Sequence, residues 1–529
     1  MLASSRPVTG KGPAGLFVPS LMLLGSALVL GLLFRDSLGL TPFVEYSLLG
    51  VGFCGMAALL VWKWNVSRSY GRLDPFELPT WFTINVFVFM VVAGLSGFRG
   101  PHSLYRRLQG DYSSLVLALF YVSLGTLALW LGYRFAPTWR RPGVRATTYS
   151  DLVSKDEVIQ PVVVLWLYAA SVGIRLYQIG TGQYSFLQDI GDDGFLAIRQ
   201  WLFYGAQIWT VVLPAVALAV FGRKAPLLGW TTLCLIILIE CVFTFIGGTK
   251  GAIIYVMTIL VACRLYERGR IPWRLVAVLG VVFIVVFPIN ALYRPLVVSG
   301  SVDTHSVADT SANVARLFHE TWLTRPLGEN VQVFLDVVMS RQSQLIQSIS
   351  LAAHVTPETI PFRYGRDYFM LPVYILIPRI IWPEKPILSG SVQFSIDYGG
   401  APANTINSTA VTLFGDLYLN FGLPGILGGM FLLGVLYRWI YGAVREAGSH
   451  SKLVLYLGLF TWMTNIEGEI VGVIQGTFQQ LIILYVLTSL MYRRAVRLEA
   501  DSNKVRMSQL PFRRSERGSC SKIVVDGLA

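Results

Sequence analysis

Apolar runs of about 20 residues recur along this chain, and they constrain its fold more than any other feature. A membrane-spanning helix needs roughly 20 apolar residues. Only 14% of the 529 residues are charged, against about 25% in soluble domains, which favours a membrane protein and argues against a nucleic-acid-binding one. The sequence therefore predicts an all-α polytopic membrane protein with about twelve transmembrane helices, at 16–34, 45–62, 79–97, 113–133, 159–178, 201–221, 228–246, 251–266, 273–293, 422–441, 453–472 and 473–491.

Lysine and arginine set the predicted orientation of these helices. The formal charge is +13, and basic residues gather at 134–145, 264–274 and 493–517. Cytoplasmic loops of membrane proteins are enriched in both residues. If both termini lie in the cytoplasm, all three clusters do too. The predicted organisation is nine helices in 1–293, a large extracytoplasmic loop at 294–421, three helices in 422–491 and a basic cytoplasmic tail at 492–529.

Cysteine and histidine give no sign of a metal or disulfide framework. Four of the five cysteines sit inside apolar runs and the fifth lies in the tail, with no CxxC spacing. His305, His319 and His354 fall in the large loop without ligand spacing. We expect neither a metal nor another cofactor.

The large loop contains an apolar stretch too short to span a bilayer. It runs from Tyr368 to Trp382 and is interrupted by Pro372 and Pro378. We interpret it as a re-entrant or interfacial element. A second piece, 331–354, has helical periodicity. Its expected apolar side includes Leu345, Ile346 and Ile349, with Gln344 and Gln347 facing away.

The loop is rich in arginine, which suits forked contacts to phosphate oxygens. It holds seven arginines and one lysine. Arg379 and Lys385 are bracketed by prolines, which fix backbone angles and would hold both cations in a set geometry. They are candidates for binding a lipid-linked diphosphate. The alternative is that such arginines form ion pairs or reach lipid phosphates.

A glycine-rich turn, "FIGGTKGAI" at 245–253, offers another cationic position. Lys250 lies near the start of a predicted helix, where anions are favoured. The segment is too short for a nucleotide-binding P-loop. The alternative is a tight turn whose lysine extends to the membrane surface.

Several carboxylates fall in apolar surroundings, where they are costly unless paired or functional. Asp416 precedes a predicted span in "LFGDLYLNFGLPGILGGMFLLG", whose glycines favour close helix packing. Glu467 and Glu469 lie in "NIEGEI", and Glu240 lies inside a predicted helix. Each is a candidate general base, since such a group must reach a hydroxyl proton. Structural pairing with the arginines on the outer side is the alternative for each.

Residues 240–440 resemble a known family. "IPRIIWPEKP", "FSIDYG", "FGDLYLNFGLPGILGGMFLLGVLYR" and "GGTKGAI" are similar to segments of bacterial O-antigen and oligosaccharide repeat-unit polymerases of the Wzy type. The resemblance implies a GT-C-like, metal-independent glycosyltransferase at the periplasmic face of the bacterial inner membrane. Its substrates would be undecaprenyl-diphosphate-linked oligosaccharides. Membrane lipid and a chain-length regulator and flippase of the same pathway would be its partners.

For the substrate that this resemblance implies, we assign expected roles to particular residues. The developing negative charge on a departing lipid diphosphate would be stabilised by Arg379, Lys385, Arg341 and Lys250. Asp416, Glu467 and Asp397 are the expected bases, in that order. Further expected substrate contacts are Arg294, Arg366, Tyr374 and Trp382, and Asp397 is also expected to contact the substrate.

Three other functions are compatible with the sequence. A flippase for the same lipid-linked sugars would scatter charge through its helices to line a path, whereas charge inside the predicted spans is sparse. A ligase that passes the finished glycan to another acceptor is barely distinguishable from a polymerase. The third is a non-catalytic protein of an exopolysaccharide assembly system.

Overall fold

A computed structural model describes most of the predicted helical region. The described residues are 77–92, 112–137, 157–181, 184, 196–222, 227–247, 251–268, 272–298, 307–324, 326, 328–329, 344–377, 381–382, 390–399, 409–447 and 449–494. The predicted spans 16–34 and 45–62 lie outside them.

The described chain is mostly helical, and long apolar helices dominate it. Its elements before the large loop are α4 (Leu78–Val86), η1 (Phe87–Val92), α7 (Tyr112–Phe135), β1 (Glu157–Ile159), α9 (Pro161–Gly180), α10 (Leu196–Ala206), α11 (Trp209–Gly222), α12 (Leu227–Gly247), α13 (Gly251–Arg268) and α14 (Trp273–Val298). Those that follow are α15 (Val307–Phe318), η3 (His319–Leu323), α17 (Arg366–Leu376), α18 (Gly390–Asp397), α19 (Leu413–Ala447), α20 (His450–Met463), α21 (Ile470–Met491) and β2 (Tyr492–Arg494).

Six helices in the described part are long and apolar enough to cross a membrane, which is consistent with a membrane protein. They are Ser114–Phe135, Pro161–Gly180, Trp201–Gly222, Leu227–Gly247, Thr412–Val444 and Ile470–Met491. Each overlaps a predicted span, whereas the total of twelve stays a prediction. Two further predicted spans correspond to shorter apolar helices, Leu78–Met90 and Trp273–Val286. The predicted span 453–472 differs most, because α20 ends at Met463.

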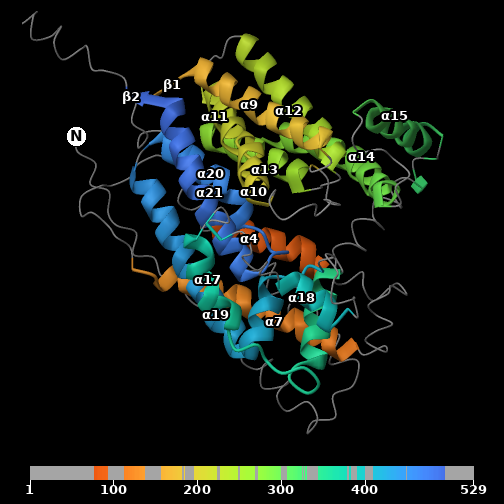
Figure 1. The fold of residues 1–529 in the computed structure, drawn as a ribbon, viewed down its shortest axis with the longest axis vertical. Coiled ribbons are helices and arrows are strands. Elements are labelled where there is room, and N and C mark those ends of the chain that lie inside the picture. Colours follow the sequence, from red (N-terminus) through yellow and green to blue (C-terminus); the bar gives the residue numbers. More distant parts are fainter. Residues whose placement is uncertain are drawn as a thin grey trace, which may run out of the picture.

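The helices form two groups joined by α20 and α21. Figure 1 shows α9 to α15 gathered at one end of the molecule and α7, α17, α18 and α19 at the other, with α20 and α21 between them. A short antiparallel pair, β1 with β2, connects the start of α9 to the end of α21. The Gln160 N–H also donates to the Met491 carbonyl at 2.9 Å. The start of α9 and the end of α21 therefore lie on the same side of the bundle.

Part of the predicted loop helix is present at 344–355. Leu345, Ile346 and Ile349 are buried as predicted. The outward orientation predicted for Gln347 is wrong, because this side chain is only 3% exposed. The helix packs into the main core on more than one face. A prediction based on a single apolar stripe therefore placed Gln347 on the wrong side.

Glycines allow α7 and α19 to approach closely. The sequence predicted close packing at the glycines of 413–434 but not which helix packs there. A Cβ at Gly434 would collide with the Leu129 carbonyl oxygen, and one at Gly132 with the Phe431 carbonyl oxygen. Gly428, in contrast, has open space around the position of its missing side chain. Small residues matter at such contacts because apolar helices gain little hydrophobic energy by associating in lipid.

We predict that Gly434→Ala destabilises the protein by about 1–3 kcal/mol, since the added methyl must push two backbones apart. Gly428→Ala on the same helix is the matched control and should be neutral or slightly stabilising. Thermal unfolding in detergent checks both variants. Equal midpoints for the two would contradict glycine-dependent packing.

Candidate functional site

The site is built on a break in α19. Gly422 has φ 64° and ψ −153°, so the helical path is interrupted there. Two residues on, Pro424 has no N–H to donate to the Asn420 carbonyl. That carbonyl instead accepts the N–H of Tyr364, at 3.1 Å. The break thus exposes backbone acceptors that a continuous helix would satisfy internally.

Backbone N–H groups of the segment before α17 donate hydrogen bonds to these acceptors. The Arg363 N–H donates to the Leu419 carbonyl at 2.9 Å. The Gly365 N–H donates to Oδ1 of Asn420 at 3.0 Å. Gly365 has φ 72°, a left-handed conformation that glycine adopts without steric cost. These bonds anchor the start of α17 against the first two turns of α19.

Asp416 lies at the junction of three helices. It belongs to the first turn of α19 and is only 4% exposed. Its Oδ2 accepts the hydroxyl of Tyr368 on α17 and the N–H of Ile470 at the start of α21, both at 2.9 Å. The Asn420 amide donates to Oδ1 at 3.3 Å. These are neutral donors, so they solvate the carboxylate without cancelling its charge.

Glu469 is the second carboxylate of the site and directly precedes α21. Its Oε2 accepts the N–H of Ser391 at 2.9 Å, and the Gly390 N–H also donates to the carboxylate. Burial, followed by the negative charge of Asp416, raises the pKa of Glu469 from an ordinary value of 4.5 to about 7. Asp416 and Glu469 together are called the carboxylate pair below.

One cation lies at the edge of the carboxylate pair. Arg363 bonds Asp397 at the end of α18, with 3.4 Å between Nη2 and Oδ2, and its charge also acts on Asp416. The contact with Asp397 is long, and the Arg363 side chain is 16% exposed.

The structure gathers only some of the predicted site residues. Asp416 and Asp397 lie in this site, and Arg366 is the exposed first residue of α17. Glu467 is half-buried two residues before Glu469, and its N–H donates to Asn465. Trp382 is half-buried. Arg379, Lys385, Arg341 and Lys250 lie outside the described residues, as do the side chains of Arg294 and Tyr374.

Arg363 and Tyr368 were not singled out as site residues from the sequence. Arg363 is one of seven loop arginines and precedes no recognisable motif. Tyr368 begins the apolar stretch that was interpreted as an interfacial element. No local pattern distinguishes Tyr368 from its apolar neighbours Phe369 and Met370, which the structure leaves exposed.

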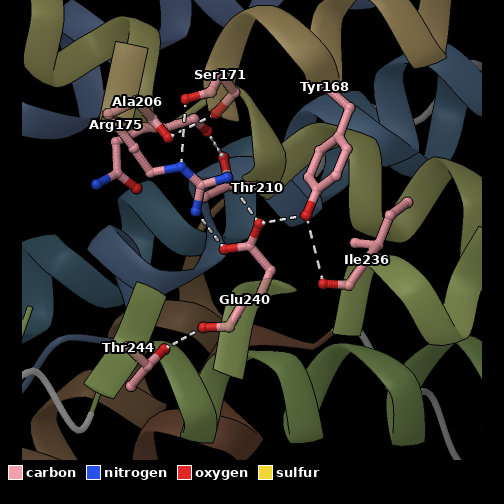
Figure 2. A network of polar contacts seen from close by, with 9 residues as sticks. Tyr168, Ser171, Arg175, Ala206, Thr210, Ile236, Glu240 and Thr244 are labelled. Carbon is pink, nitrogen blue, oxygen red and sulfur yellow. Dashed lines mark hydrogen bonds and ion pairs between the residues drawn. The ribbon is translucent and has the colours of Figure 1, made fainter. Parts of the chain in front are cut away.

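A second charged network crosslinks α9 and α12. Figure 2 shows Arg175 forming a forked ion pair with Glu240, with nitrogen–oxygen distances of 2.6 and 2.8 Å. Tyr168 donates to Glu240 at 2.9 Å, and the guanidinium lies 4.1 Å above the centre of the Phe243 ring. Both charged side chains are 2% exposed. The predicted alternative for Glu240, pairing with arginine, is therefore what the structure contains.

Comparison with known proteins places the chain in a family. Residues 185–498 match the family described as "Domain of unknown function (DUF8712)", and this match covers more than half of the chain. The chain belongs to that family. No curated protein matches it. No solved structure matches it either.

We predict that Arg175→Met alone lowers stability by about 3–5 kcal/mol, because it leaves Glu240 as an uncompensated buried charge. The double variant Arg175→Met with Glu240→Leu should recover most of that loss. Unfolding of the two variants in detergent gives the comparison. A double variant as unstable as the single one would show that the charge pairing is not what matters.

We predict that Glu469→Gln stabilises the folded protein more at about pH 8 than at about pH 5. The pKa of Glu469 is raised on folding to about 7, so its contribution to stability is complete below 4.5 and is lost as pH rises through 7. Glutamine does not ionise, so the variant does not lose this stability as the pH rises. Unfolding midpoints of both proteins across this range test the sign, and a pH-independent difference would contradict it.

Proposed function

We propose that this protein is a membrane glycosyltransferase that polymerises undecaprenyl-diphosphate-linked oligosaccharides, like the Wzy-type polymerases its sequence resembles. In this proposal the site lies at the periplasmic face of the bacterial inner membrane, with both termini in the cytoplasm. The observation that carries it is the carboxylate pair, in which the pKa of Glu469 is raised to about 7, with Arg363 at its edge. A general base works best when its pKa is near the working pH.

The reaction assigns a separate role to each charged group. Glu469 accepts the proton of an acceptor sugar hydroxyl, whose oxygen then forms a bond to the anomeric carbon of the lipid-linked glycan. The bond between that carbon and the diphosphate oxygen breaks, and the electron pair leaves with the lipid diphosphate. Burial, followed by the negative charge of Asp416, keeps the pKa of Glu469 high. Arg363 stabilises the leaving diphosphate.

The apolar surface of α17 suits the lipid part of such a substrate. Phe369, Met370 and Val373 are exposed on this helix, Phe369 by 80%. Tyr368, on the opposite side, holds Asp416. A prenyl chain lying on the exposed face would bring its diphosphate beside the carboxylate pair. The loop cations Arg379 and Lys385 remain proposed diphosphate ligands from the sequence alone.

A flippase for the same lipid-linked sugars is the second candidate, and the Arg175–Glu240 pair is the observation relevant to it. Charges inside spanning helices commonly line transport pathways. This pair is 2% exposed and each charge neutralises the other, so it favours a structural crosslink over a path. A ligase remains the closest enzymatic alternative, since its leaving group is the same.

We predict that Glu469→Gln and Arg363→Ala abolish chain extension, because they remove the base and the cation beside the leaving group. A strain lacking the gene, complemented with each variant, should show single repeat units in place of long surface glycans on gels. Glu358→Gln, an exposed carboxylate on the same loop, is the matched control and should restore full chains. Membrane levels of each variant are measured in parallel.

Long chains with both site variants would remove Glu469 and Arg363 from the mechanism. Complete loss of surface glycan in the deletion strain would favour the flippase or ligase. A further check is the pH dependence of the purified enzyme. Activity should rise as pH increases through about 7, because only ionised Glu469 accepts a proton.

A further inference from the structure

The middle of α21 carries buried polar atoms that have no partner. Gln480 is only 1% exposed, and neither Nε2 nor Oε1 finds a hydrogen bond within the described part of the chain. The same holds for the hydroxyl of Thr477, one turn earlier. This helix is among the six that are long and apolar enough to cross a membrane.

Two other polar side chains of α21, the buried Thr488 and the half-buried Gln479, have partners. Thr488 donates to the Leu484 carbonyl of its own helix at 2.8 Å. Gln479 accepts a hydrogen bond from the hydroxyl of Tyr204 on α10. The missing partners are therefore a feature of the position of Thr477 and Gln480 and not of polar residues in this helix generally.

The neighbours of Gln480 place it between two tight contacts on the buried face of α21. One turn before it, the Trp462 ring of α20 occupies the space beside Gly476. One turn after it, Leu484 packs against Gly458 of α20. Gln480 thus lies at the α20–α21 interface. Helical spacing also puts it on the same face as Glu469, through positions 473 and 476.

An unpaired amide and hydroxyl in an apolar interior are costly, so buried polar groups normally have a protein or water partner. Gln480 offers two donors and an acceptor, and Thr477 offers one hydroxyl. Neither residue is charged. We propose that Gln480 and Thr477 form a buried binding site for a neutral hydroxyl group, supplied either by water or by a sugar. This inference does not depend on the proposed function.

Pulsed radiolytic labelling of the purified protein in lipid nanodiscs tests the site. Hydroxyl radicals formed from bound water oxidise side chains next to it, even where bulk solvent does not reach. Leu484 is buried and lies one turn from Gln480, whereas the equally buried Leu129 on α7 serves as control. We expect several-fold faster oxidation of Leu484 than of Leu129. Equal rates would overturn the proposal.

The labelling also separates the two sources of the hydroxyl group. Leu484 oxidation that persists when a lipid-linked oligosaccharide is added identifies water as the ligand. Oxidation that occurs without the oligosaccharide and is suppressed by it shows that a sugar hydroxyl displaces the water. Both results support a polar binding site.

An isosteric pair of variants gives a second measurement that does not require Gln480 to be changed. Thr477→Val should reduce Leu484 labelling and leave the unfolding midpoint unchanged or lower, because it removes a hydrogen bond to the ligand. Thr488→Val is the matched control on the same helix and should retain the labelling. A higher midpoint for Thr477→Val would overturn the proposal, since it would mean that the native hydroxyl lies unpaired in a dry interior.

Discussion

The break in α19 at Gly422 is the constraint on which the candidate site depends. A continuous helix would satisfy the carbonyls of Leu419 and Asn420 internally, whereas the break leaves them to the N–H groups of Arg363 and Tyr364. The chain that enters α17 is therefore docked on α19 by its backbone. Such breaks are stable inside a bundle only where other groups replace the lost helical bonds. Here the replacement also brings α17 to Asp416.

The bundle contains two buried charged centres, Arg175 with Glu240 and Asp416 with Glu469. The energetic cost of burying charge is offset differently in each. Arg175 and Glu240 form a forked ion pair, so both charges are compensated within 2.8 Å. Asp416 and Glu469 have the same sign and are held by neutral donors, with Arg363 at the edge. A compensated pair favours rigidity. An uncompensated one favours chemistry, because burial and the charge of Asp416 raise the pKa of Glu469 to about 7.

Helix α21 connects the features that lie far apart in sequence. Its first N–H binds Asp416, and Glu469 directly precedes it. Its buried face carries Gln480 midway, and its end continues into β2, which pairs with β1 ahead of α9. One helix thus joins the carboxylate pair, the buried polar site and the opposite side of the bundle.

Local composition predicted part of this architecture correctly. The apolar runs located six long helices, the glycines of 413–434 indicated close helix packing without naming the partner helix, and Asp416 was singled out by its apolar surroundings. The exact ends of the helices were harder to predict from the sequence. The run 453–472 was interpreted as one span, but α20 ends at Met463 and Glu469 lies in the turn that follows. Hydropathy alone does not distinguish an apolar turn packed in a core from a helix.

The sequence by itself determined which segments are apolar, where cations gather and which carboxylates are costly, because these properties belong to each residue and its neighbours in the chain. Only the tertiary structure decided which charges meet. Arg175 and Glu240 are 65 positions apart, and Ile470 binds Asp416 across 54. Pairing at such separations is set by helix packing and by the backbone groups left open at Gly422, neither of which leaves a local pattern in the sequence.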